Sequence, residues 1–219
     1  MARSAVILAE DYSAEFGQDK ALLDLRGKPL LKHVVDAVES LVDEVIVVAQ
    51  TKECSQQYAQ VLSEDVKFAF NLDSAKSPLV GAAAGLEVAH GKHSVLLAAD
   101  APFVNPDVLS LFFELCHGKT AVITRWPDEQ IEPIHAVYDT KCALEAARIA
   151  LVDGKLDLPS MIANLGGVRY VSTLVVQELD PELKIFFSVN SAVNLKMAET
   201  LIKPRNPQNA KRKKPLFKR

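Results

Sequence analysis

The chain of 219 residues lacks long apolar runs, paired cysteines and a dinucleotide-binding glycine motif. No run approaches the roughly 18 apolar residues of a membrane-spanning helix, so we expect no membrane insertion. The cysteines Cys54, Cys116 and Cys142 form no CxxC pair, which argues against a zinc site or a disulfide scaffold and predicts free thiols in the reducing cytoplasm. No GxGxxG follows the first apolar run, which disfavours a dinucleotide-dependent dehydrogenase.

Charge is distributed unevenly along the chain. Residues 203–219 contain eight Lys or Arg, three prolines and no acidic residue. Without this segment, 17 basic residues stand against 28 acidic ones, so residues 1–202 carry a net charge of about −11. We therefore predict one domain over residues 1–202 and a disordered basic tail over residues 203–219. Because no structured basic surface accompanies the tail, nucleic acid is not the expected partner.

Apolar runs and helical patterns alternate through the first 125 residues. The runs at residues 5–9, 44–49, 66–71, 94–100 and 120–125 read as buried strands with helical spacers between them. Near-continuous apolar strands of this kind are typical of a parallel sheet covered on both faces. We predict an α/β fold, a Rossmann-like three-layer sandwich with a mostly parallel sheet.

Two polar residues stand where such a sheet binds ligands, at the carboxyl ends of its strands. Asp100 ends a strand run, and a carboxylate there could hold Mg²⁺ against phosphate oxygens. A helix-capping role suits Asp100 less, because Asn105 fits the start of the next helix better. Lys20 follows the first strand and could act as a mobile positive charge on phosphate, or simply pair with Asp19 or Asp24.

Five pieces of the chain match motifs of one family. Residues 100–103 match DxPF. Residues 8–31 match LAGGxSxRMGxDKALLxxxGxPLL in part, residues 78–86 match GPLxGxxxGL in part, residues 132–138 match EPLxALY in part, and Asn190 keeps part of NxNTPEDL. In this order they resemble the molybdenum cofactor guanylyltransferase family, whose fold is similar to that of the nucleotide-diphospho-sugar transferases. The resemblance spans residues 4–202 and is specific only as a joint pattern.

The resemblance implies a reaction and a set of site residues. It implies Mg²⁺-dependent transfer of GMP from GTP to the phosphate of molybdopterin, with Lys20 and Asp100 as catalytic residues and Asp100 as the metal ligand. Glu132 and Asn190 would lie towards the pterin. The residues implied at the nucleotide are Leu8, Ala9, Glu10, Lys20, Gln50, Asp73 and Asp100.

The phosphate loop departs from the family pattern. Glu10 and Asp11 replace two glycines, and Glu15 replaces an arginine. Side chains obstruct the approach of backbone N–H groups to a triphosphate, and each unfavourable charge pair at about 4 Å costs up to about 4 kcal/mol. Two hypotheses follow. The chain is either an active nucleotidyltransferase with an altered loop, acting on GTP or another nucleoside triphosphate, or a catalytically degenerate homologue that serves as a binding or regulatory module with a protein partner in molybdoenzyme biogenesis.

Overall fold

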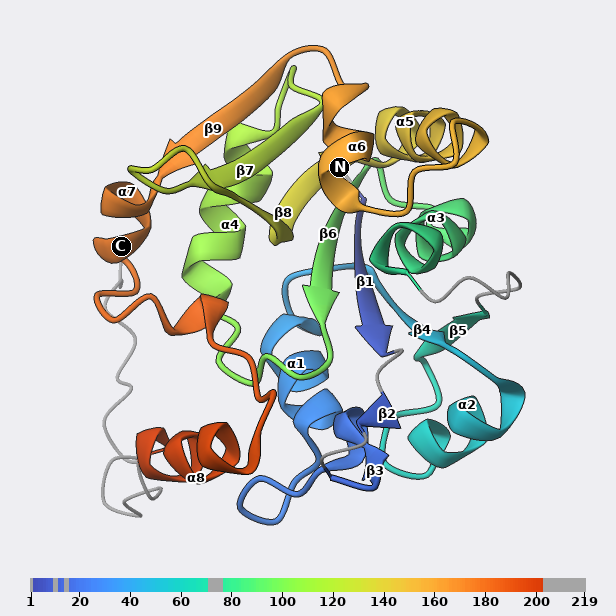
Figure 1. Cartoon of the computed structure of the whole chain (residues 1–219), viewed down its shortest axis with the longest axis vertical. Coiled ribbons are helices and arrows are strands. Elements are labelled where there is room, and N and C mark those ends of the chain that lie inside the picture. Colours follow the sequence, from blue (N-terminus) through green and yellow to red (C-terminus); the bar gives the residue numbers. More distant parts are fainter. Residues whose placement is uncertain (1, 10–11, 14–15, 71–76, 203–219) are drawn as a thin grey trace, which may run out of the picture.

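The computed structural model describes residues 2–9, 12–13, 16–70 and 77–202 (Figure 1). Its strands are β1 (Arg3–Ala9), β2 (Tyr12–Ser13), β3 (Gln18–Asp19), β4 (Glu44–Ala49), β5 (Lys67–Phe70), β6 (His93–Ala98), β7 (Ala121–Arg125), β8 (Ile131–Asp139) and β9 (Val168–Ser172). Its helices are α1 (Leu30–Val38), α2 (Lys52–Ala59), α3 (Pro78–Val88), α4 (Pro106–Leu115), α5 (Thr140–Val152), α6 (Leu158–Ala163), α7 (Thr173–Gln177) and α8 (Ala192–Leu201), with 3₁₀ turns η1 (Lys20–Leu22) and η2 (Lys184–Phe186).

The central sheet has the strand order β5-β4-β1-β6-β8-β7-β9. Only β8 runs antiparallel to its neighbours β6 and β7, so the predicted, mostly parallel α/β sheet is confirmed. The strand predicted over residues 94–100 ends at Ala98, which leaves Asp100 in the following turn. Asn105 caps α4 by accepting hydrogen bonds from the backbone N–H groups of Asp107 and Val108.

Helices cover both faces of the sheet, as expected for three layers. Successive residues of β1 point to opposite faces: Ile7 packs with α1 and α4, and Val6 packs with α3, α5 and α6. The glycine at position 85 lets α3 lie close against the sheet, because a Cβ there would stand 2.3 Å from Cγ1 of Val6. All three cysteines are free thiols, as predicted. No helix in the described ranges is long and apolar enough to cross a membrane.

A third, smaller apolar cluster joins the two ends of the described chain. Leu25 and Leu30 from the N-terminal part pack with Val189 and Ala198 from the C-terminal part. Figure 1 shows α8 at the end of the molecule towards which the arrowheads of β1 and β6 point. This cluster therefore brings α8 to the carboxyl edge of the sheet. Residues 203–219 lie outside the described residues, so the basic tail and the domain boundary stay predictions.

Candidate functional site

Three of the predicted site residues meet at the carboxyl edge of the sheet. The Nζ atom of Lys20 lies 3.1 Å from Oδ2 of Asp100 and 3.0 Å from Oδ1 of Asn190. The side chains of Lys20 and Asp100 are 12% and 11% exposed, so their ion pair is largely shielded from water. Charge attraction is strengthened in such a setting, where water screens it less. Lys20 thus pairs with Asp100, 80 residues away along the chain, and it is no freely exposed surface lysine.

The turn that carries Lys20 is shaped by the residue before it. Asp19 caps η1, and its Oδ1 accepts a hydrogen bond of 2.8 Å from the backbone N–H of Ala21. The hydroxyl of Tyr58 donates to the same carboxylate through Oδ2. The Asp19 carboxylate therefore contacts both the backbone of η1 and Tyr58 of α2, and it fixes the start of the turn from which Lys20 extends.

Two backbone contacts place Asp100 and Asn190 beside each other. The N–H of Ala101 donates to the carbonyl of Ala98 at 3.3 Å, which closes the turn after β6. The carbonyl of Asp100 accepts a hydrogen bond of 2.9 Å from the N–H of Val189, the residue before Asn190. A segment far along the chain is thereby fixed against the Asp100 turn. Asp100 caps no helix, since Asn105 caps α4.

The other residues implied at the nucleotide divide into two groups. Leu8 and Ala9 end β1, and Gln50 follows β4, the neighbouring strand, so these three share one edge of the sheet. Nε2 of Gln50 is buried and makes no hydrogen bond within the described part of the chain. A buried amide donor without a partner costs free energy, which a ligand acceptor would relieve. Glu10 and Asp73 lie outside the described residues.

Glu132 lines a cavity of about 290 Å³. The cavity is lined by Pro78, Glu132, Pro133, Ile134, Leu156, Asp157, Leu158 and Pro159. Burial raises the pKa of Glu132, although the indole N–H of Trp126, which donates to its Oε1 at 2.7 Å, opposes that shift. The structure therefore places Glu132, which lies on β8, at the cavity beside α3 and α6, and it places Asn190 beside Lys20.

Strand β8 is irregular next to Glu132. Residues 133–136 of β8 stand opposite residue 123 of β7, and His135 has a positive φ of 62°. Such a φ is strained for a residue with a side chain. Burial lowers the pKa of His135 to about 4, and its Nε2 has no hydrogen-bond partner in the described ranges. The sequence pattern did not single out His135, Trp126 or Tyr58, and for Tyr58 the reason is that its contact with Asp19 joins residues 39 positions apart.

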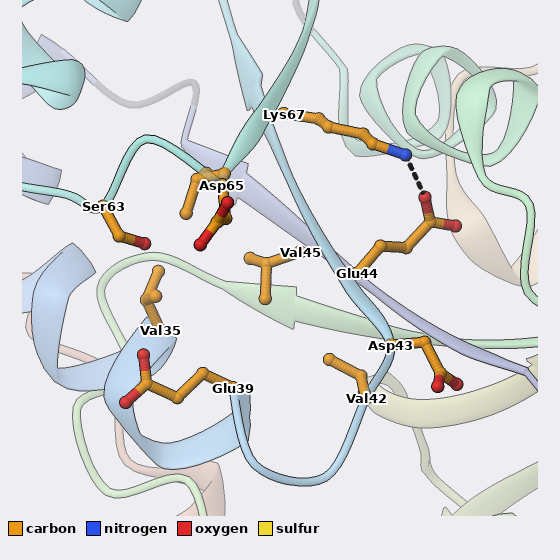
Figure 2. Close-up of a pocket in the computed structure, with 10 residues that line it drawn as sticks. Val35, Glu39, Val42, Asp43, Glu44, Val45, Ser63, Asp65 and Lys67 are labelled. Carbon is orange, nitrogen blue, oxygen red and sulfur yellow. Dashed lines mark hydrogen bonds and ion pairs between the residues drawn. The ribbon is translucent and has the colours of Figure 1, made fainter.

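A second cavity, of about 520 Å³, lies at the opposite edge of the sheet (Figure 2). Glu44 and Lys67, which begin β4 and β5, point towards each other there and form an ion pair of 2.7 Å. Glu39, Asp43 and Asp65 add acidic groups to the wall. Because ligands of parallel α/β sheets bind at the carboxyl ends of the strands, this cavity at their amino ends is not the candidate site.

The donor set at the carboxyl edge fits Mg²⁺. Mg²⁺ binds through one or two carboxylates together with water and phosphate oxygens. Asp100 supplies a carboxylate and Asn190 an amide oxygen, and both now accept hydrogen bonds from the Lys20 ammonium, a cation. Within the described ranges no group of three or more His, Cys, Asp or Glu could hold a metal ion. Any Mg²⁺ here would therefore need oxygens from the nucleotide or water.

The fold is similar to that of solved proteins with nucleotidyltransferase-like names. It superposes on a molybdopterin-guanine dinucleotide biosynthesis protein A from Archaeoglobus fulgidus with a TM-score of 0.76 at 24% identity, covering 90% of this chain and 97% of that one. It also superposes on 2-C-methyl-D-erythritol 4-phosphate cytidylyltransferase from Thermus thermophilus with a TM-score of 0.65 at 19% identity, covering 92% and 98% of the two chains.

Sequence comparison identifies the family. The chain is 32% identical to a probable molybdenum cofactor guanylyltransferase from Methanosarcina mazei over 198 residues, 88% of each chain. It is 30% identical to a molybdenum cofactor guanylyltransferase from Desulfosudis oleivorans, covering 91% of this chain and 96% of that one. The family model of the MobA-like NTP transferase domain matches residues 5–168. The chain belongs to the MobA-like NTP transferase family.

Proposed function

We propose that the chain is a Mg²⁺-dependent nucleotidyltransferase that transfers GMP from GTP to molybdopterin. The observation that carries the proposal is the Lys20–Asp100–Asn190 cluster at the ligand-binding edge of the sheet, in a chain of this family. The names of its relatives support guanine and the molybdenum cofactor as substrates. The three free thiols fit the cytoplasm as the place of reaction, which stays a prediction.

In the proposed reaction a phosphate oxygen of molybdopterin attacks the α-phosphorus of GTP in line. A new P–O bond forms to that oxygen, and the bond between the α-phosphorus and the bridging oxygen breaks, so that pyrophosphate leaves with the electron pair. The attacking phosphate oxygen is already an anion, so no proton has to be removed from it. Positioning and charge stabilisation are then the main tasks of the protein.

Lys20 performs the charge stabilisation in this scheme. Its ammonium group now has Asp100 and Asn190 as acceptors, and phosphate oxygens of a bound triphosphate are acceptors of the same kind. Asp100, with Asn190 as a second oxygen donor, would hold Mg²⁺, which neutralises phosphate charge when it is bound. Gln50 offers its buried Nε2 donor to the base or the ribose.

The chemistry of the loop supports a second candidate function. Glu10, Asp11 and Glu15 place negative charge where the family has two glycines and an arginine. The chain would then be a degenerate homologue that binds a protein partner in molybdoenzyme biogenesis. The two functions differ in one measurable property, because only the enzyme requires binding of a nucleoside triphosphate.

Thermal unfolding with GTP, CTP or ATP, each with excess Mg²⁺, distinguishes the two functions. A nucleotide present at about 100 times its Kd stabilises the fold by about 2.7 kcal/mol. For a domain of this size, that gain raises the Tm by roughly 5–10 °C. We expect GTP to give the largest shift and to release pyrophosphate once molybdopterin is added. Absence of any shift at millimolar nucleotide would leave only the degenerate homologue.

A loop variant tests the reason for the second candidate. We expect stronger GTP binding when the acidic side chains are removed and the arginine is restored, because obstruction and repulsion both disappear. The variant combines Glu10→Gly, Asp11→Gly and Glu15→Arg. A control, Glu129→Arg, makes the charge change of Glu15→Arg alone at an exposed residue of the turn between β7 and β8. Equal GTP affinity in the loop variant and the control would contradict this account of the loop.

A further inference from the structure

Tyr58 is a buried hydroxyl that the proposed reaction does not use directly. It is fully buried, although the helix that carries it, α2, is otherwise mostly polar. Its hydroxyl donates to the carbonyl oxygen of Ala9 at 3.0 Å and to the Asp19 carboxylate. A phenol has one proton, so the two acceptors share it. A phenylalanine would fill the same space but would form neither hydrogen bond, so both contacts depend on the hydroxyl group.

The two acceptors are the two ends of one loop. Ala9 is the last residue of β1, and Asp19 caps the turn that carries Lys20, so residues 10–18 lie between the two contacts. The short β2–β3 pair closes the same segment, with Tyr12 opposite Asp19. Figure 1 shows α2 beside this pair. Tyr58 thus contacts the residues on both sides of this segment, Ala9 and Asp19, and joins them to α2.

We propose that Tyr58 is a positioning residue for Lys20, acting through Asp19. The carboxylate of Asp19 touches Tyr58 with one oxygen and caps the η1 turn with the other, at 2.8 Å from the N–H of Ala21. A displacement of that carboxylate therefore shifts the turn from which Lys20 reaches Asp100. This inference rests on the proposed function only for the catalytic role of Lys20. The restraint itself can be measured without any nucleotide.

The test is Tyr58→Phe, which removes only the hydroxyl. A matched control is Thr140→Val, because Thr140 is also buried and its hydroxyl donates to the carbonyl of Gly91 at 2.7 Å, at the opposite edge of the sheet. Both variants should lower the Tm by a few degrees, since each removes a hydrogen bond to a buried carbonyl. The decisive readout is the rate at which acetic anhydride acetylates Lys20, measured by mass spectrometry against the exposed Lys155 in the same sample.

We expect acetylation of Lys20 to become about fivefold faster in Tyr58→Phe, a change that corresponds to about 1 kcal/mol, and to stay unchanged in Thr140→Val. Asp19→Asn weakens the same Tyr58–Asp19 hydrogen bond by changing its acceptor. The double variant should therefore acetylate at Lys20 little faster than Tyr58→Phe alone. Three results would contradict the inference that Tyr58 restrains Lys20. They are an unchanged acetylation rate of Lys20 in Tyr58→Phe, an equal rise of that rate in Thr140→Val, and fully additive effects of Tyr58→Phe and Asp19→Asn.

Kinetics then test whether the restraint serves the reaction. In the active enzyme, Tyr58→Phe should lower kcat about tenfold or more while the KM for GTP changes less, because misalignment affects the transition state most. Unchanged kcat and KM with faster acetylation would overturn the positioning role. If the wild-type chain binds no nucleotide, the proposed function fails, and the acetylation result still decides whether Tyr58 restrains Lys20.

Discussion

Replacing Lys20 by methionine should destabilise the protein even when no ligand is present. Methionine keeps much of the aliphatic stem but removes the ammonium group, which lies 3.1 Å from Asp100 and 3.0 Å from Asn190. At 3.1 Å and an effective dielectric constant of 20, the gross attraction between the two charges is about 5 kcal/mol. Desolvation of two largely buried groups offsets part of it, and a charged hydrogen bond retains about 1.5–3 kcal/mol.

We therefore expect Lys20→Met to lower the free energy of unfolding by about 2–3 kcal/mol. For a domain of this size, the Tm should fall by roughly 5–10 °C in thermal unfolding followed by circular dichroism. The matched control is Lys184→Met. Lys184 pairs with Glu182 at a similar distance of 3.0 Å, but that carboxylate is 67% exposed. An exposed pair contributes less than about 1 kcal/mol, so the control should change the Tm little.

Mg²⁺ gives the same variant a second readout. In Lys20→Met the Asp100 carboxylate loses the Lys20 cation, so millimolar Mg²⁺ should stabilise this variant more than the wild-type protein. Asp100→Asn should abolish that response. Equal Tm losses in Lys20→Met and Lys184→Met would refute the energetic importance of the Lys20–Asp100 pair. A response to Mg²⁺ that survives Asp100→Asn would refute Asp100 as the metal ligand.

Two further predictions concern parts of the fold away from the nucleotide. Gly85→Ala should lower the free energy of unfolding by about 1–3 kcal/mol in urea titrations, because its Cβ would clash with Val6, whereas Gly166→Ala meets nothing within 4 Å and should change little. Burial alone would raise the pKa of Glu44, but hydrogen bonds from Lys67 and other donors outweigh burial and lower that pKa to about 2. The stability that Glu44 contributes is therefore full above its unfolded pKa of 4.5 and is lost as the pH falls towards 2. The Tm difference between wild type and Glu44→Gln should shrink over that range, and a constant difference would contradict the pKa shift.

The strand pattern was largely readable from the sequence because burial on both faces requires apolar residues at successive positions. β4 matches its predicted run, residues 44–49, and α4 begins where Asn105 and Pro106 indicate. The end of β6 was less predictable. Ala99 continues the apolar run in composition, so the strand was predicted to extend to Asp100, but the structure turns the chain after Ala98.

The sequence by itself determined the layered α/β fold and the chemical types at the strand ends, since periodicity and local motifs carry that information. It named Lys20 and Asp100 from their positions after strands, and Asn190 from its match to a family motif. Only the tertiary structure decided that their side chains meet, because the third apolar cluster carries Val189 and α8 across the molecule. The tertiary structure also decided that the hydroxyl of Tyr58 donates to Asp19, a contact between residues 39 positions apart that no local pattern encodes.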